Sequence, residues 1–229
     1  MAKKKRVTRK ELLKEPDEFI TFAGKMIRFA KAHRSQLLYG LGALVFVVLI
    51  ISAVHVYANW RENQAFDLLE KAMSRYDENR SDKADLVDDV KQALQTVAEK
   101  YSRYHGGKLA RVMYANLSYD TGDFNTAIEN YLKALEAFHE DPSISLFIQI
   151  SLGYAYEAKK DYKTAIKYFE QVASSPMEFL KDEALYQLGR LYAKTGQQEK
   201  SKEAFDNILS NHPDSIYIEL VKESVQSLL

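Results

Sequence analysis

The chain has no cysteine, and its 229 residues include only four prolines and nine glycines. Without cysteine there is no disulfide framework, no thiol nucleophile, no iron–sulfur cluster and no Cys-ligated zinc site. Neither glycine nor proline occurs between Ala43 and His105. Nothing in the backbone therefore obliges a helix in this stretch to stop before the polar residues that begin at Asp77.

The residue patterns of catalysis and metal binding are missing as well. The five histidines are scattered, and none lies three or four residues from another, as a helical zinc pair would. There is no Gly-x-Ser-x-Gly motif and no phosphate-binding glycine loop, and we interpret His105-Gly106-Gly107 as a turn between helices. We therefore expect a protein that is not an enzyme and uses no metal, no cofactor and no small-molecule substrate.

The formal net charge is zero, but the charges are unevenly distributed. Residues 1–34 hold 11 basic and 4 acidic residues, whereas residues 61–229 hold 21 basic and 28 acidic ones. This balance argues against nucleic acid as a partner. The run Lys3-Lys4-Lys5-Arg6 could be a nuclear signal or a nucleic-acid patch, but beside a long apolar segment we favour contact with anionic lipid.

The apolar segment lies between the two charged regions. No Asp, Glu, Lys or Arg occurs in residues 35–60, and its apolar part runs from Leu37 to Tyr57. As a helix this part is about 31 Å long, close to the roughly 30 Å of a bilayer's hydrocarbon core. We predict a transmembrane helix over 35–60, with aromatic residues at both ends: Tyr39, Tyr57 and Trp60.

The ends of the apolar segment bear on its orientation and processing. Val56-Tyr57-Ala58 resembles a signal-peptidase site, but the basic segment in front of the span is much longer than that of a signal peptide. We therefore favour an uncleaved signal-anchor. The basic bias predicts a cytoplasmic N-terminus and a translocated C-terminal domain.

Residues 1–34 are expected to form a basic cytoplasmic arm with an amphipathic helix next to the membrane. Pro16 followed by Asp17 and Glu18 is typical of a helix start. The predicted apolar face comprises Phe19, Phe22, Ala23, Met26, Ile27 and Ala30. Such a helix lies in the membrane interface, or alternatively docks onto the cytoplasmic loops of a membrane partner.

The C-terminal region contains an internal repeat. Four residues recur 36 positions later: Leu152, Gly153, Tyr156 and Phe169 become Leu188, Gly189, Tyr192 and Phe205. The prolines of this region, Pro142, Pro176 and Pro213, are spaced 34 and 37 residues apart. A period of this length is typical of a solenoid.

The order Leu-Gly-x-x-Tyr, then Ala, an aromatic residue and Pro, resembles the tetratricopeptide repeat. The resemblance implies an all-α solenoid of antiparallel helix pairs, in which small residues at Gly153 and Ala165 let the helices approach closely. The expected repeats span about 108–144, 146–180 and 182–214. An atypical helical pair at 61–104 precedes them, and a capping helix at 215–229 covers the last repeat.

The layout of arm, single anchor and repeats resembles the bacterial ancillary SecYEG translocon subunit family, the YfgM-like proteins. The resemblance implies a single-pass protein of the bacterial inner membrane with a periplasmic domain. Its implied partners are the Sec translocon, periplasmic chaperones and secreted proteins. Two alternatives stay open: an envelope scaffold or assembly factor of the cell-division or cytochrome-maturation type, and an N-anchored organelle import receptor with cytosolic repeats.

In repeats of this kind the first helix of each pair lines the concave surface. The candidate partner-binding positions there are Asn116, Tyr119, Asp120, Phe147, Tyr154, Glu157, Glu183, Tyr186, Arg190 and Lys194. Exposed Tyr and Arg are frequent at interaction hot spots, although Tyr119, Phe147 and Tyr186 could equally belong to the core. The clamp that binds C-terminal carboxylates in some tetratricopeptide proteins needs Lys, Asn and Arg where this chain has Val112, Phe147 and Ser151.

Overall fold

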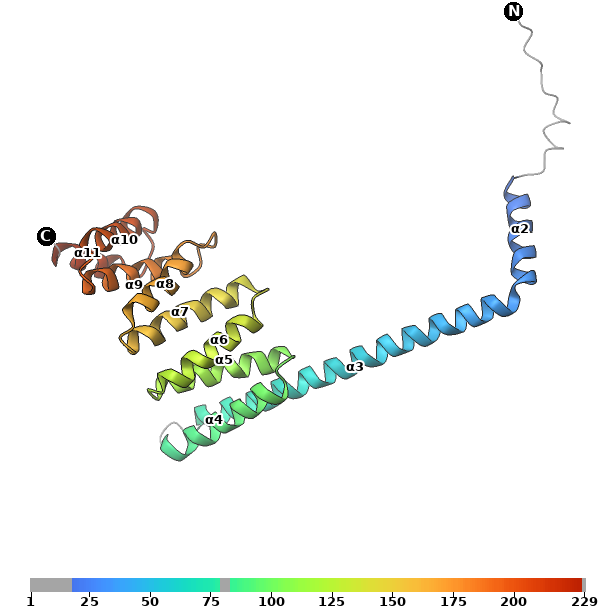
Figure 1. The fold of residues 1–229 in the computed structure, drawn as a ribbon, viewed down its shortest axis with the longest axis horizontal. Coiled ribbons are helices and arrows are strands. Elements are labelled where there is room, and N and C mark those ends of the chain that lie inside the picture. The colour runs from blue at the N-terminus through green and yellow to red at the C-terminus, as the bar shows by residue number, and fades with distance from the viewer. Residues whose placement is uncertain (1–17, 79–82, 228–229) are drawn as a thin grey trace, which may run out of the picture. The chain divides into compact units, whose positions relative to one another are not determined.

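The computed structural model describes residues 18–78 and 83–227, and every regular element in them is an α-helix (Figure 1). The all-α prediction is thus confirmed for the described part of the chain. Two units are distinguished, Met1–Ala58 and Asn59–Leu229. The predicted helix start at Pro16 and the basic run Lys3-Lys4-Lys5-Arg6 lie outside the described residues.

The first unit consists of α2 (Glu18–Ala32) and the N-terminal part of α3 (Arg34–Glu78). In α2, Phe22, Met26 and Ile27 of the predicted apolar face are exposed, and Phe29 is exposed beside them. Phe22, Met26 and Phe29 are spaced four and three residues apart and make one apolar stripe along the helix, with Ile27 beside it. Nothing within the described part of this unit covers that stripe.

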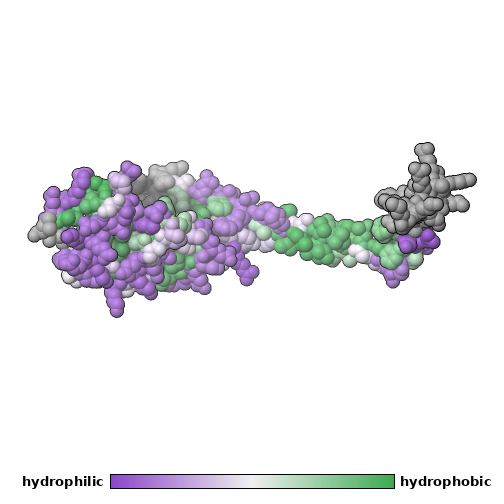
Figure 2. All heavy atoms as spheres, turned by 90° about the horizontal axis from the view of Figure 1, so that it is seen from above, coloured by the Kyte–Doolittle hydropathy of each residue, from purple (hydrophilic) through white to green (hydrophobic). Residues whose placement is uncertain are grey.

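The apolar part of α3 is exposed all round. Every large apolar side chain from Leu37 to Tyr57 lies open, and Figure 2 shows this stretch as continuous hydrophobic surface. By length and composition the segment Arg34–Ser74 could cross a bilayer. Because α3 continues to Glu78, the predicted span is one part of a longer helix.

The second unit begins with the C-terminal part of α3, which pairs with α4 (Lys83–Lys100). Ala65, Leu69 and Ala72 of α3 are buried in one cluster with Val90 and Leu94 of α4. Small residues on α3 allow close packing, and the branched side chains of α4 fill the remaining space.

Three helix pairs and a final helix complete this unit. The pairs are α5 (His105–Asp120) with α6 (Phe124–Ala137), α7 (Pro142–Ala158) with α8 (Tyr162–Ala173), and α9 (Lys181–Lys194) with α10 (Gln198–Asn211). The final helix is α11 (Ile218–Ser227). Each helix packs against the next, so every inner pair contacts the pairs on both sides.

Short-range chemistry explains where several helices begin. Asp123, Asp141 and Asp161 each accept a hydrogen bond from the backbone N–H three residues later, which satisfies a free donor at the start of α6, α7 and α8. Pro142 is the first residue of α7, where its missing N–H costs nothing.

The interpretation of His105-Gly106-Gly107 as a turn is wrong, because these residues form the first turn of α5. The Glu62 carboxylate of α3 accepts hydrogen bonds from the backbone N–H groups of His105 (3.1 Å) and Gly106 (2.8 Å). A Cβ on Gly106 would lie 2.7 Å from that of Ala65. Glycine is needed here for close helix packing rather than for a turn.

The repeated Gly and Phe positions are packing partners. A Cβ on Gly153 would lie 2.6 Å from the ring of Phe169, and one on Gly189 would lie closer still to the ring of Phe205. Both rings are fully buried. The recurrence in the sequence therefore reflects one helix contact built twice, in which a small residue makes room for an aromatic ring.

Candidate protein-interaction groove

Two adjoining pockets open along α5 and α7. The first, which we call the aromatic pocket, has a volume of about 280 Å³ and is lined by Asn116, Tyr119, Asp120, Tyr131, Phe147, Ser151 and Tyr154. The second, the apolar pocket, has a volume of about 420 Å³ and is lined by Leu109, Val112, Met113, Asn116, Ser143, Ile144, Phe147 and Phe179. Asn116 and Phe147 line both, so the two pockets form one groove, the α5–α7 groove.

Tyrosine hydroxyls make the polar wall of the aromatic pocket. The Tyr131 hydroxyl, which comes from α6, donates a hydrogen bond of 2.6 Å to Asn116 Oδ1. The Tyr119 ring lies 5.5 Å from that of Phe124, between ring centroids. Burial raises the pKa of both Tyr119 and Tyr131 above the ordinary tyrosine value. Both hydroxyls are therefore neutral at physiological pH, and the Tyr131 oxygen can still accept a hydrogen bond while its proton is donated to Asn116.

Tyr154 connects this pocket with the next repeat. Its hydroxyl donates to Glu183 Oε1 at 2.6 Å and accepts from Gln187 Nε2 at 2.9 Å. Burial, and then the bond to Glu183, raise the pKa of Tyr154. Arg190 donates to Gln187 Oε1 and forms an ion pair of 3.2 Å with Glu157. One polar network thus joins α7 to α9.

The remaining two predicted positions lie elsewhere. The Tyr186 ring stacks on that of Tyr217, with 4.6 Å between centroids and 15° between planes, and it also packs against Phe205. The Lys194 ammonium group lies 4.6 Å from the centroid of the Tyr162 ring. Tyr186 therefore takes part in covering the last repeat, and Lys194 in a cation–π contact near the start of α8.

The ten predicted positions thus separate into three groups. Five line the aromatic pocket: Asn116, Tyr119, Asp120, Phe147 and Tyr154. Glu157, Glu183 and Arg190 belong to the network behind it. Phe147 is 46% exposed, so it is a surface residue and not part of the core.

Sequence reasoning missed eight of the thirteen residues that line the groove: Leu109, Val112, Met113, Tyr131, Ser143, Ile144, Ser151 and Phe179. Tyr131 comes from the second helix of its pair, and only its match to the repeated aromatic position could have drawn attention to it. Ser151 was considered only because it stands where the carboxylate clamp needs another residue type. Phe179, 51% exposed, comes from the loop between α8 and α9, and nothing in the sequence pattern indicated it.

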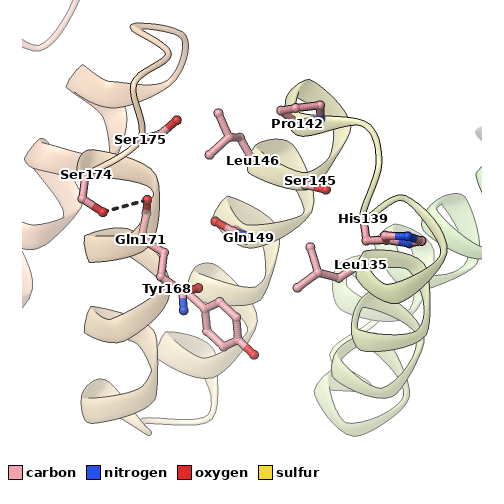
Figure 3. Close-up of a pocket in the computed structure, with 10 residues that line it drawn as sticks. All are labelled: Leu135, His139, Pro142, Ser145, Leu146, Gln149, Tyr168, Gln171, Ser174 and Ser175. Carbon is pink, nitrogen blue, oxygen red and sulfur yellow. Dashed lines mark hydrogen bonds between the residues drawn. The ribbon is translucent and has the colours of Figure 1, made fainter.

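A wider pocket of about 620 Å³ lies between α6, α7 and α8, and none of its residues was predicted (Figure 3). Gln149, which lies on α7, contributes a buried Oε1 that has no hydrogen-bond partner among the described residues. Leu135, Leu146 and Tyr168 supply apolar surface around it. Within residues 18–78 and 83–227, no cluster of three His, Asp or Glu side chains is arranged to hold a metal ion.

Comparison with known proteins gives one family match and several similar folds. The model of a family described as the tetratricopeptide repeat-like domain matches residues 37–228. A Podosopora anserina protein described as a kinesin light chain with nearly identical TPR-like repeats superposes with a TM-score of 0.51 at 17% identity, covering 71% of this chain and 91% of that one. The MamA protein gives a TM-score of 0.51 at 22% identity, covering 70% and 84%.

These structural likenesses establish the fold. At such low identity they show the fold alone, an all-α solenoid of TPR-like repeats. The family match shows the same kind of repeat, which is typically a non-enzymatic scaffold for protein–protein interactions. No curated protein matches the sequence. The family match begins at residue 37, so it includes the apolar part of α3.

Proposed function

Because the chain belongs to the tetratricopeptide repeat-like domain family, we propose that it is a membrane-anchored protein-interaction module whose α5–α7 groove binds other proteins. The observation that carries the proposal is the groove itself. It combines an exposed aromatic ring, Phe147, with a neighbouring apolar pocket and a set of neutral hydroxyls. Aromatic anchors beside polar groups are the usual hot spots of protein interfaces.

The exposed part of α3 supports the membrane anchor. In water, a stretch of about twenty exposed and mostly apolar residues would carry a large unfavourable hydration free energy, which burial in lipid removes. The family match begins at residue 37 and so includes this segment, which supports an anchor that stays with the domain.

We further propose that the protein lies in a bacterial inner membrane, with the N-terminal arm in the cytoplasm and residues 61–229 in the periplasm. The excess of basic residues before the apolar segment supports this orientation. There the groove would assist the Sec translocon and periplasmic chaperones with proteins emerging from the membrane. The resemblance in layout to the ancillary translocon subunit family supports this assignment.

The orientation is testable because the chain has no cysteine of its own. Lys25→Cys in α2 and Lys133→Cys in α6 place single thiols at exposed positions of the two units. We expect a membrane-impermeant maleimide to label only Lys133→Cys in intact spheroplasts, and both variants after lysis. Labelling of Lys25→Cys alone would reverse the orientation and favour an organelle import receptor with cytosolic repeats.

The partner is testable by crosslinking from the groove. A photo-reactive amino acid at position 147 replaces an exposed side chain that lines both pockets. The matched control carries it at position 132, an exposed leucine of α6 outside the groove. We expect products with translocon subunits, periplasmic chaperones or secreted chains from position 147 only. Products made up of cell-division or cytochrome-assembly proteins would replace the translocon role with that of an envelope scaffold.

A further inference from the structure

The acidic residues of the predicted groove differ in their partners. Glu157 forms an ion pair with Arg190, and Glu183 accepts the hydrogen bond of the Tyr154 hydroxyl. Asp120, at the end of α5, is exposed and lines the aromatic pocket. Among residues 18–78 and 83–227, no Lys, Arg or His forms an ion pair with the Asp120 carboxylate. The pocket therefore carries one negative charge that the described residues do not balance.

Around this carboxylate the pocket is unusually aromatic. Three tyrosines and Phe147 line a space of about 280 Å³. The faces of aromatic rings attract cations, and the attraction is stronger where water is partly excluded. The Ser151 side chain and the Asn116 amide add hydrogen-bond acceptors. Rings, acceptors and a carboxylate together suit a guanidinium or ammonium group.

The neighbouring apolar pocket has the opposite character. Its walls are leucine, valine, methionine, isoleucine and phenylalanine side chains, with Asn116 and Ser143 as its polar members. It shares Asn116 and Phe147 with the aromatic pocket. In an extended chain, side chains two positions apart point the same way and lie about 7 Å apart. Two pockets that share the Asn116 and Phe147 side chains can take two such same-facing side chains of one segment.

We propose that the α5–α7 groove binds an extended protein segment that carries a basic side chain two positions from a bulky apolar one. The Arg or Lys side chain enters the aromatic pocket against Asp120, and the apolar side chain enters the apolar pocket beside Phe147. The inference rests on the proposed function of the groove and adds the chemistry of its partner. The acidic balance of residues 61–229 favours the approach of basic segments.

Four labelled peptides test this specificity on the full chain in nanodiscs of zwitterionic phosphatidylcholine, with empty nanodiscs subtracted. The parent peptide is Gly-Ser-Phe-Ser-Arg-Ser-Gly, and the others replace Arg by Lys, by the neutral isostere citrulline, or by Glu. By fluorescence polarisation we expect the Arg and Lys peptides to bind at least about tenfold more tightly than the citrulline and Glu peptides. Equal affinity for the four peptides would overturn the proposal.

Two variants test whether Asp120 is the source of the preference for a positively charged side chain. Asp120→Asn removes the charge of the pocket, and we expect it to reduce the preference for Arg over citrulline to less than about twofold. The control, Asp206→Asn, removes the same charge from an exposed position of α10, and it should keep the full preference. A preference that survives Asp120→Asn, or that Asp206→Asn abolishes equally, contradicts an Asp120-centred cation pocket.

A third variant separates this inference from the groove function itself. Phe147→Ser removes the ring that both pockets share, and we expect it to weaken all four peptides. If Phe147→Ser weakens binding while the four wild-type affinities are equal, the groove binds protein segments and only the cation specificity is overturned. If no peptide binds the wild-type chain, both the inference and the groove function are overturned.

Discussion

At the scale of single residues, Gly107 limits the distance between two elements, whereas Gly122 and Gly196 adopt positive φ in turns. Gly107 is buried within the first turn of α5. A Cβ at this position would overlap the carbonyl oxygen of Tyr101, which is backbone and cannot rotate away. The chain therefore folds back from α4 into α5 only if residue 107 has no side chain.

We predict that Gly107→Ala lowers the free energy of unfolding by about 3 kcal/mol, although alanine is the better helix former by about 1 kcal/mol. Chemical denaturation followed by circular dichroism measures the change. Gly24→Ala in α2 is the control, because its Cβ would meet only Arg28 at an ordinary 3.9 Å. An unchanged denaturation midpoint for Gly107→Ala would contradict the packing described at this turn.

The helix-capping aspartates allow a second prediction, on pKa. The Thr164 hydroxyl donates to Asp161 Oδ2 at 2.7 Å, and the Thr164 backbone N–H donates to Oδ1 at 3.1 Å. These bonds, the hydroxyl first, lower the pKa of Asp161. Thr164→Val removes the hydroxyl alone, so an NMR titration should show this pKa rising towards the ordinary value. The pKa of Asp123, lowered by its own bonds to Thr126, should not move.

The sign of the associated stability follows from the direction of the shift. The pKa of Asp161 is lower in the folded state than in the unfolded state, where an Asp has a pKa of about 3.9. The cap therefore contributes its full stabilisation at pH values above this unfolded-state pKa. The contribution is lost as the pH falls through the folded-state pKa. Because Asp161 is exposed, solvent screens this contribution and keeps it small. An Asp161 pKa unaffected by Thr164→Val would show that the hydroxyl bond is absent in solution.

At the scale of elements, α5 is capped by another helix instead of by its own N-cap residue. Tyr104 at the N-cap position makes no side-chain capping bond, and the Glu62 carboxylate of α3 takes that role. A carboxylate at a helix N-terminus gains from both hydrogen bonding and the helix dipole. This contact links α3 to the first helix of the next pair.

We predict that Glu62→Gln lowers the free energy of unfolding by about 1 kcal/mol, because the amide keeps one acceptor but loses the charge. Urea denaturation at low ionic strength measures the effect, which should shrink as salt is added. Glu70→Gln, an exposed position two turns along α3, is the matched control and should change little. A loss of stability no larger than that of the control would contradict the capping role.

The sequence predicted those elements whose signals are local. The paired recurrence of Gly153 with Phe169 indicates helix packing because the period keeps both partners in register. Gly106-Gly107 was misread, because its role depends on Ala65 and Tyr101, residues that no local pattern connects to it.

The candidate site shows the same division between residues that a local pattern predicts and residues that only the folded chain brings together. Asn116, Tyr119 and Asp120 could be placed together because they lie on one face of a single helix, α5. Phe179 could not be placed with them from the sequence, because it reaches the apolar pocket from a loop of a later repeat. Tyr186 lies on the predicted face, but its stacking on Tyr217 depends on the chain after α10, beyond the reach of the repeat pattern.

At the scale of the whole molecule, the two units have different surfaces. In the first unit, the large apolar side chains from Phe22 to Tyr57 are exposed. In the second unit, the four buried clusters collect most of the apolar side chains inside. The neutral net charge conceals a matching contrast between a basic arm and an acidic repeat region. The apolar surface of the first unit needs to be covered by lipid or by a partner protein. The second unit, in contrast, buries its apolar side chains in a core of its own.

The helix shared by the units allows a prediction about where the chain can be cut. A fragment of residues 59–229 keeps Ala65, Leu69 and Ala72, which pack in one cluster with Val90 and Leu94. A fragment of residues 79–229 loses those three side chains and also the Glu62 cap. Because losing one buried leucine side chain costs about 2–5 kcal/mol, and 1 kcal/mol moves Tm by about 2–4 °C, the shorter fragment should melt at least about 10 °C lower.

Circular dichroism melts of the two fragments, with sedimentation velocity, measure this difference. The longer fragment should be soluble without detergent, helical and cooperative in unfolding, since it lacks the exposed apolar segment but retains its core. In the shorter one, α4 loses its packing partner, so the loss should begin at that end and spread through neighbouring contacts, as in other repeat proteins. Equal melting temperatures would mean that residues 59–78 serve only as a stalk, and that the repeat domain begins at α4.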